Sequence, residues 1–203
     1  MQRHLVIFTR LPRLGAGKRR LAADIGPVAA LRFQRTALAA TLRRLRRDPR
    51  WRTWLAITPD RGGPWPAGLP RIGQGGGDLG RRMARVARAL PPGPVMIVGS
   101  DIPGIRRHHI AAGFRALGGS DAVFGPAGDG GYWLVGLRRR PRFFDPFGGV
   151  RWSTRHALAD TLANLAGRRI TLLEVLDDID DGAALARHLH PENHHDRRHH
   201  QAA

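Results

Sequence analysis

Short apolar runs alternate with segments of helical periodicity along most of this chain of 203 residues. The runs, which we interpret as buried strands, lie at 5–9, 54–58, 94–98, 122–124, 132–137 and 170–176. The helical segments lie at 18–25, 27–45, 78–90, 106–117, 153–167 and 183–189. Because strands that alternate with helices are joined by crossovers, this order predicts one α/β domain with a mixed, mostly parallel sheet that helices cover on both faces.

Capping and turn residues support these boundaries. Gly26 ends one helix, and Pro27 suits the first turn of the next, where a missing N–H costs nothing. Asp78 and Ser153 can each cap a helix N-terminus with a side-chain oxygen. Residues 62–77 are rich in glycine and proline, and we expect them to form one long loop.

Composition excludes several classes of protein. Hydrophobic residues make up 42% and charged residues 25%, which excludes a wholly disordered chain. The absence of cysteine excludes disulfides, thiolate zinc sites and cysteine nucleophiles. Aliphatic stretches such as 95–98 are far shorter than the roughly 20 residues of a membrane helix, and the run at 5–8 is too short for a signal peptide. We therefore expect a cytoplasmic protein without a membrane partner.

The formal net charge of +18 comes from 34 basic and 16 acidic residues. Such an excess usually indicates a polyanionic partner, and the arginines within 43–47 or 138–140 would be the footprint of a nucleic acid. These arginines lack the interleaved aromatic residues of a single-strand binding platform. Lys18 is the only lysine, so the excess of arginine also resembles a coding bias. Nucleic-acid binding is therefore a disfavoured alternative.

Residues 190–203 form a separate segment that is rich in histidine and almost without apolar residues. We expect a disordered tail here, after a domain that spans 1–189. The histidines offer ligands for a transition metal, but no carboxylate or cysteine pattern fixes a coordination geometry, so a solvated tail is favoured.

The segment 12–21 follows the first strand and precedes a helix, and it contains Gly15, Gly17, Lys18 and Arg19. At such a junction free backbone N–H groups favour an anion, and glycines let the backbone approach a phosphate. The segment is not a Walker A element, because Arg19 stands where that motif has serine or threonine. A lone lysine among arginines suggests a site for a compact ammonium. We interpret the segment as a phosphate-binding loop; a glycine turn with solvated arginines is the alternative.

Two acidic segments follow predicted strands. Asp101 comes at the carboxyl end of the strand 94–98, where open α/β sheets bind ligands. The segment 177–181 holds four aspartates, which repel one another unless a cation neutralises them. Carboxylates are hard oxygen ligands suited to Mg²⁺ or Mn²⁺. We predict that one of these aspartates meets Asp101 and completes a divalent-metal site. The alternatives are an Asp101 that caps a turn and a solvated helix N-terminus.

Asp129 lies among glycines in the segment 125–133, between two predicted strands. Glycines allow close approach of the backbone, so the segment suits the border of a substrate pocket. A tight hairpin of the Asp-Gly kind is the alternative, and the two interpretations are compatible.

Taken together, these segments resemble the CofC-like transferases, also called rSAM/selenodomain-associated transferase 1, of the nucleotide-diphospho-sugar transferase superfamily. The stretches that carry the resemblance are FTRLPRLGAGKRRL from Phe8, QGGGDLGRRM from Gln74, GSDIPGI from Gly99, FGPAGDGGYWLVGL from Phe124, WST from Trp152 and DDIDD from Asp177. Their order and spacing fit from about residue 5 to 189, and the stretch from Phe124 is the most specific. Two departures are Arg19, where the family commonly has threonine, and 178–181, where it commonly has Asp-Val-Asp-Thr.

The resemblance implies a GT-A fold, a Rossmann-like three-layer sandwich, and the transfer of a glycosyl or nucleotidyl group with Mg²⁺ or Mn²⁺. It implies that a nucleotide or nucleotide-sugar is bound by Gly15, Gly17, Lys18, Arg19, Gln74, Gly77 and Asp78. It assigns the metal to Asp101 with Asp178 or Asp180, catalysis to Lys18, Asp101 and Asp129, and the acceptor pocket to Gly130, Gly131 and Tyr132. A phospholactate guanylyltransferase-like enzyme and a catalytically inactive member of the fold are the remaining alternatives.

Overall fold

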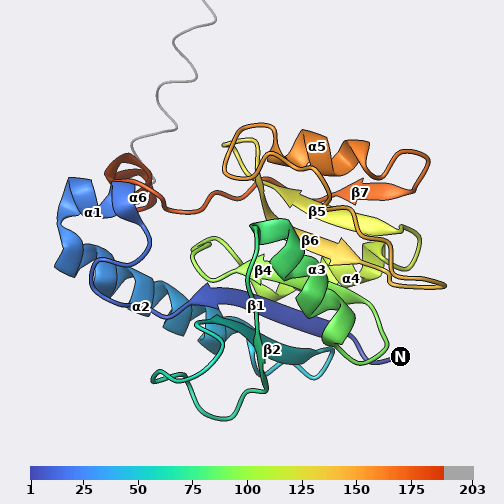
Figure 1. Ribbon diagram of the computed structural model, residues 1–203, viewed down its shortest axis with the longest axis horizontal. Helices are drawn as coiled ribbons and strands as arrows, with labels where there is room; N and C mark the ends of the chain where they lie inside the picture. Colours follow the sequence, from blue (N-terminus) through green and yellow to red (C-terminus); the bar gives the residue numbers. More distant parts are fainter. Residues whose placement is uncertain (190–203) are drawn as a thin grey trace, which may run out of the picture.

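The computed structural model describes residues 1–189, which form a seven-stranded sheet with helices around it (Figure 1). The strands are β1 (His4–Arg10), β2 (Arg52–Thr58), β3 (Arg71–Gly73), β4 (Val95–Gly99), β5 (Ala122–Pro126), β6 (Tyr132–Leu137) and β7 (Ile170–Leu172). They lie in the order β3-β2-β1-β4-β6-β5-β7. β6 runs antiparallel to both of its neighbours, and the other pairs are parallel. The expected α/β fold with a mixed, mostly parallel sheet is confirmed.

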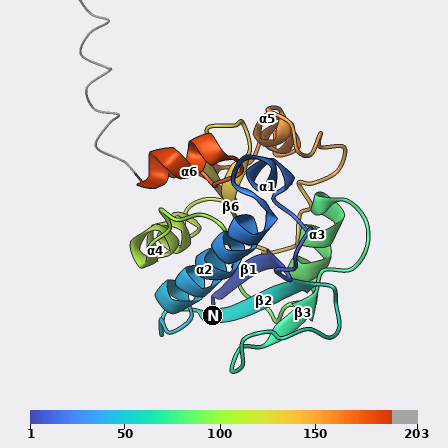
Figure 2. The same cartoon turned by 90° about the vertical axis from the view of Figure 1, so that its left-hand side faces the viewer.

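Helices cover both faces of the sheet, as Figure 2 shows. They are α1 (Arg19–Ile25), α2 (Pro27–Leu45), α3 (Leu79–Ala89), α4 (Arg107–Ala116), α5 (Ala157–Ala163) and α6 (Gly182–Leu189). Side chains alternate along a strand, so Leu5 and Ile7 of β1 pack with α2 and α4, whereas Val6 packs with α3. Both faces are therefore apolar, which explains the continuous hydrophobic runs in the sequence.

A third, smaller core joins segments that are far apart in the sequence. Leu21 of α1, Ala30 of α2 and Ile179 are buried together in it. After β7 the chain returns across the molecule, and the described part of it ends with α6 beside α1 (Figure 1). The backbone N–H of Gly182 donates to Oδ2 of Asp24 at 2.7 Å, which fastens the start of α6 to α1.

Three segments differ clearly from the predictions, apart from shifts of a few residues at the ends of other elements. The segment 62–77 is not one loop, because β3 pairs with β2 within it. The helix expected from Ser153 begins at Ala157 instead, since Ser153 has a φ of 61° and Thr154 forms a turn by donating to the carbonyl of Arg151. β7 is shorter than expected because it lies at the edge of the sheet and pairs only with the start of β5. The histidine-rich tail lies outside the described residues.

The parallel strands bring their connections to one edge of the sheet. β1, β4, β5 and β7 point the same way, so their carboxyl ends meet there. The chain that follows these strands carries Lys18, Asp101, Asp129 and the acidic segment 177–181. The fold therefore collects the charged residues singled out in the sequence along one edge.

Candidate active site

Lys18 lies at the centre of a three-aspartate cluster formed by Asp101, Asp178 and Asp180. Its Nζ lies 2.5 Å from Oδ2 of Asp101, 2.5 Å from Oδ1 of Asp180 and 3.6 Å from Oδ2 of Asp178. The Lys18 side chain is 9% exposed, whereas those of the aspartates are 29%, 32% and 43% exposed. The structure thus brings both Asp178 and Asp180 to Asp101, and one ammonium is their common partner.

The acidic segment is oriented by a buried residue between its two carboxylates. Ile179 is 2% exposed and packs into the small core with Leu21 and Ala30. In an extended segment successive side chains point to opposite sides, so Asp178 and Asp180 both point away from that core and toward Lys18. The alternation in the DDIDD sequence therefore places the carboxylates of Asp178 and Asp180 on the side that faces Lys18.

The other two members of the cluster come from connections that follow central strands. Asp101 lies two residues after the end of β4. Lys18 precedes α1 with a φ of 44°, in the left-handed region, and the positive φ values of Gly15 and Gly17 form the turn that leads to it. These glycines therefore direct the chain so that the lysine side chain reaches the carboxylates.

The electrostatics of the cluster depend on burial and on mutual charge. Burial alone would lower the pKa of Lys18, but Asp101 and Asp180 raise it well above its usual value. Burial, together with the charges of Asp180 and Asp101, raises the pKa of Asp178 to about 7. Burial would also raise the pKa of Asp180, but the ammonium of Lys18 holds it below its usual value. The ammonium of Lys18 thus stabilises the ionised form of Asp180 more than that of Asp178.

The cluster has the chemistry of a divalent-metal site. Asp101, Asp178 and Asp180 each offer a carboxylate oxygen, and these oxygens lie within 4.8 Å of one another. Hard oxygen ligands at this spacing suit Mg²⁺ or Mn²⁺, and the ammonium of Lys18 shows that the position between them attracts a cation. The donor set therefore fits the ion expected from the sequence.

A basic pocket of about 470 Å³ lies on the β1 side of the cluster. Arg10 at the end of β1, Arg82 of α3 and Lys18 all line it. The Nε of Arg82 is buried and finds no hydrogen-bond partner within residues 1–189. Three cationic side chains around one cavity are suited to a ligand with several negative charges.

Gln74 lines the basic pocket and also holds one of its arginines. It is 1% exposed, and its amide donates to the carbonyls of Thr9 at 2.9 Å and Ala56 at 2.8 Å. Its Oε1 accepts a hydrogen bond from Nη2 of Arg82. All the polar atoms of this side chain are therefore engaged within the protein, and Gln74 holds Arg82 in place.

A second cavity, the aromatic pocket, has a volume of about 500 Å³. Tyr132, Trp133 and Trp152 line it, as does Asp129. The hydroxyl of Tyr132 lies 3.5 Å from Oγ1 of Thr161, and burial raises the pKa of that phenol. Asp101 and Asp180 line both pockets, so the cluster stands where the two cavities meet.

The loop with Asp129 keeps its shape through its own backbone. Oδ1 of Asp129 accepts from the N–H of Gly131 at 2.8 Å, which is the turn expected of an Asp-Gly segment. Gly130 has a φ of 85°, and a Cβ at this position would overlap the carbonyl of Arg155. Gly131 lines the aromatic pocket beside Asp129, so the segment is at once a tight turn and a pocket wall.

Several residues predicted for the nucleotide lie elsewhere. Gly15 and Arg19 line a separate cavity of about 120 Å³, which Gly17 shares with the basic pocket. Asp78 caps α3 by accepting from the N–H of Arg81 at 2.7 Å, next to Gly77 with its φ of 99°. Neither Asp78 nor Gly77 lines the two pockets beside the cluster.

Some residues that line the two pockets were not identified as site residues from the sequence. Arg10 and Arg82 line the basic pocket, Trp152 lines the aromatic pocket, and Ser153 lines both. Arg10 could have been identified as a pocket residue from the sequence, because it ends a strand on the edge of the sheet where ligands bind. The sequence indicated Arg82 less clearly, by its position one turn into the helix that Asp78 caps.

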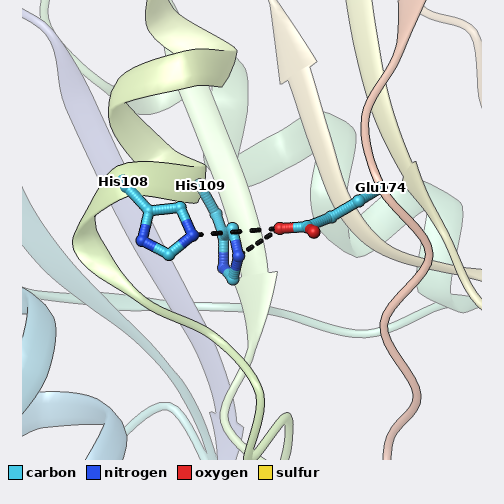
Figure 3. Close-up of side chains that lie close together, drawn as sticks. All are labelled: His108, His109 and Glu174. Carbon is cyan, nitrogen blue, oxygen red and sulfur yellow. Dashed lines mark ion pairs between the residues drawn. The ribbon is translucent and has the colours of Figure 1, made fainter.

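A second group of possible metal ligands lies outside these pockets (Figure 3). His108 and His109 of α4 face Glu174, which follows β7. Nδ1 of His109 accepts from the N–H of Arg106 at 2.9 Å, so the proton of the neutral ring is on Nε2 and is donated to Glu174. A protonated nitrogen has no free lone pair for a metal. The group therefore joins α4 to the chain after β7, and we do not assign a metal to it.

Known proteins share this fold. A family model described as "Uncharacterized protein conserved in bacteria (DUF2064)" matches residues 41–154. The crystal structure of a "putative nucleotide-diphospho-sugar transferase" from Desulfovibrio desulfuricans G20 is 25% identical, with a TM-score of 0.84 over 98% of this chain and 91% of that chain. The expected relationship to the nucleotide-diphospho-sugar transferase superfamily is thereby confirmed.

Two more distant structures agree in fold alone. The manganese complex of Rv0371C from Mycobacterium tuberculosis H37Rv is 16% identical, with a TM-score of 0.55 over 92% of this chain and 97% of that chain. The 4-diphosphocytidyl-2C-methyl-D-erythritolsynthase from Anaerococcus prevotii DSM 20548 is 10% identical, with a TM-score of 0.58 over 91% and 95%. The comparison with curated proteins finds no match. Within residues 1–189 no helix is long and apolar enough to cross a membrane.

Proposed function

Because the chain belongs to the DUF2064 family of bacterial proteins and carries an acidic cluster between two pockets, we propose that it is a metal-dependent transferase acting on a nucleotide-activated substrate. The observation that carries this proposal is that Asp101 and Asp180 line both cavities. A group that leaves a ligand in one pocket for a ligand in the other must pass the carboxylates. A site of this kind is what a transfer between two bound substrates requires.

The nucleotide belongs in the basic pocket. Arg10, Lys18 and Arg82 line it and supply positive charge for the phosphates. Guanidinium groups bind phosphate oxygens in a fork, and an ammonium binds them as a point charge. Because Gln74 fixes the guanidinium of Arg82, little conformational freedom is lost when a phosphate binds there.

The acceptor belongs in the aromatic pocket. Tyr132, Trp133 and Trp152 provide flat apolar surface, and Asp129 provides a carboxylate that can hold a hydroxyl of the acceptor. Arg20 and Arg155 also line this pocket, so an acceptor with a negative charge is accommodated. The turn at 129–131 keeps Asp129 at the wall of the cavity.

Asp101, Asp178 and Asp180 would hold the divalent ion. Such an ion neutralises negative charge that develops on phosphate oxygens during transfer. The protein residues bind and orient the two substrates around it, which is the main requirement of phosphoryl chemistry, since no covalent nucleophile is needed. The name of the 25% identical Desulfovibrio structure agrees with a transferase, and the transferase class expected from the sequence is confirmed at this level.

Ligand-induced stabilisation tests the proposal. A ligand that binds only the folded protein raises its melting temperature, so nucleoside triphosphates and nucleotide-sugars are screened with and without Mg²⁺ or Mn²⁺. We expect a shift that needs both nucleotide and metal, and its loss in Asp101→Asn. Asp145→Asn is the control, because Asp145 pairs with Arg88 and lines neither pocket. A screen in which no nucleotide stabilises the protein contradicts the proposal.

The leaving group then distinguishes the two reactions. Nucleotidyl transfer from a triphosphate releases pyrophosphate, whereas glycosyl transfer from a nucleotide-sugar releases a nucleoside diphosphate. Each nucleotide that stabilises the protein is incubated with phosphorylated and hydroxylated acceptors, and both products are assayed. Release of either product in an acceptor-dependent manner supports the proposal, and release of neither contradicts it.

A further inference from the structure

The ammonium of Lys18 occupies the position that a divalent ion would need. Its Nζ lies 2.5 Å from carboxylate oxygens of both Asp101 and Asp180. Mg²⁺ lies about 2.0–2.1 Å from its oxygen ligands, so an ion bound by these two carboxylates would overlap the nitrogen. Lys18 and the metal therefore exclude each other, and the metal can bind only when the lysine side chain moves.

Moving the ammonium is costly unless it meets another anion. The Lys18 side chain is 9% exposed, and its neighbours in the cluster are the carboxylates that the metal would take. A buried ammonium without a partner is strongly unfavourable. In the protein alone, this cost opposes the binding of the metal.

The basic pocket is where a new anion would be found. Lys18 lines this pocket as well as touching the cluster, so a rotation of its side chain can take Nζ from one to the other. Arg10 and Arg82 line the same pocket, and neither has an ion-pair partner within the part of the chain that the structure describes. A ligand with several negative charges would thus meet three cations there and would receive the displaced ammonium.

We infer that Lys18 is a counter-cation that couples the metal to the nucleotide: its ammonium keeps the cluster closed to divalent ions and leaves it when an oligophosphate binds. This inference rests on the proposed function, because it needs a metal at the cluster and a phosphate in the basic pocket. Coupling of this kind is reciprocal, so the metal must strengthen phosphate binding by the same factor.

Binding of Mn²⁺ alone to the full chain, measured by isothermal titration calorimetry, tests the first half. Lys18→Met removes the competing charge, so we expect its Mn²⁺ affinity to exceed that of the wild type by at least about tenfold, within the usual range of such couplings. Lys18→Arg should stay as weak as the wild type. Arg32→Met is the control, because Arg32 is exposed on α2, makes no ion pair with the cluster and lines neither pocket.

Lys18→Gln keeps a hydrogen-bond donor without the charge, and it serves if the methionine variant does not fold. Circular dichroism establishes that each variant is folded before titration. Equal or weaker Mn²⁺ binding in the folded neutral variants overturns the inference while leaving the proposed function intact. Absence of Mn²⁺ binding in every variant overturns both.

Inorganic pyrophosphate tests the second half. Titrations with Mn²⁺ are repeated at saturating pyrophosphate, with free Mn²⁺ corrected for its complex with pyrophosphate. We expect wild-type affinity for Mn²⁺ to rise on the order of tenfold, and the rise to be largely lost in Lys18→Met, whose cluster is already open. An equal rise in both proteins would mean that the coupling does not pass through Lys18, and would overturn the inference.

Discussion

Ile179 and Leu21 are buried together in a small core, although the chain between them contains six of the seven strands, β2 to β7. Leu21 belongs to the helix that follows Lys18, and Ile179 stands between Asp178 and Asp180. The contact therefore fixes the acidic segment against the lysine loop. An apolar contact outside the sheet thus orients the aspartates that contact Lys18.

Ile179→Ala is expected to loosen the cluster. Loss of a buried isoleucine side chain costs about 2–5 kcal/mol of stability, toward the lower end in a core this small. We expect the affinity for Mn²⁺ to fall on the order of tenfold, as when a residue that orients metal ligands is removed. Calorimetric titration and thermal unfolding measure the two effects. Leu165→Ala, in the core on the α3 and α5 face, should lose stability while keeping its metal affinity.

Arg82 and Arg81 form a natural pair for testing the basic pocket. Arg82 lines the pocket with a buried Nε, whereas its neighbour Arg81 is exposed and lines neither pocket. Arg82→Met should weaken nucleotide binding about 10- to 100-fold, the loss of a charged hydrogen bond of about 1.5–3 kcal/mol. Arg81→Met should change it little. Similar losses in both variants would show that general charge, not the pocket, attracts the nucleotide.

Much of the fold could be predicted because local patterns and tertiary contacts agree. The apolar run before Gly99 is buried on both faces of the sheet, so its continuous hydrophobic pattern correctly predicted a buried strand there. β3 could not be predicted, because Arg71–Gly73 has no apolar pattern and is a strand only by virtue of its pairing with β2. The start of α5 was missed for a related reason: the turn at 151–156 uses the hydroxyl of Thr154, and no sequence rule gives priority to that bond over a cap at Ser153.

The sequence predicted the positions of those site residues that directly follow a strand, because the direction of the strand alone places them at the ligand-binding edge of the sheet. Asp101 follows a parallel strand, and its place at the ligand-binding edge follows from topology. The partnership of Lys18 with the aspartates was not foreseen, since it depends on how the segment after β7 returns to α1. Gln74 lines the basic pocket, as the family resemblance implied, but the hydrogen bonds of its amide to two strand carbonyls could not be read from the sequence.

Gly130→Ala should disturb the aromatic pocket. The backbone at Gly130 has a φ of 85°, and a Cβ there would overlap the carbonyl of Arg155. Strain and overlap together should cost about 1–3 kcal/mol and displace the turn that carries Asp129. Chemical unfolding measures the loss. In Gly148→Ala the new methyl group meets open space, so a change of no more than about 0.5 kcal/mol is expected; equal losses would contradict this description of the loop.

The contribution of His109 to the stability of the protein should fall as the pH is lowered below neutrality. Burial, more than any other influence, lowers the pKa of this imidazole below its usual value of 6.5, although Glu174 partly opposes the effect. The unfolded chain then binds a proton at a pH where the folded ring is still neutral, so the stability that His109 contributes is present above pH 6.5 and is lost as the pH falls from that value through the lower pKa of the folded protein. His109→Asn is the test, because its amide oxygen can still accept the N–H of Arg106 but does not titrate. Melting temperatures between pH 5 and pH 8 should therefore decline less steeply toward acid in the variant than in the wild type. Parallel curves would mean that His109 takes up its proton equally well in the folded and unfolded chains.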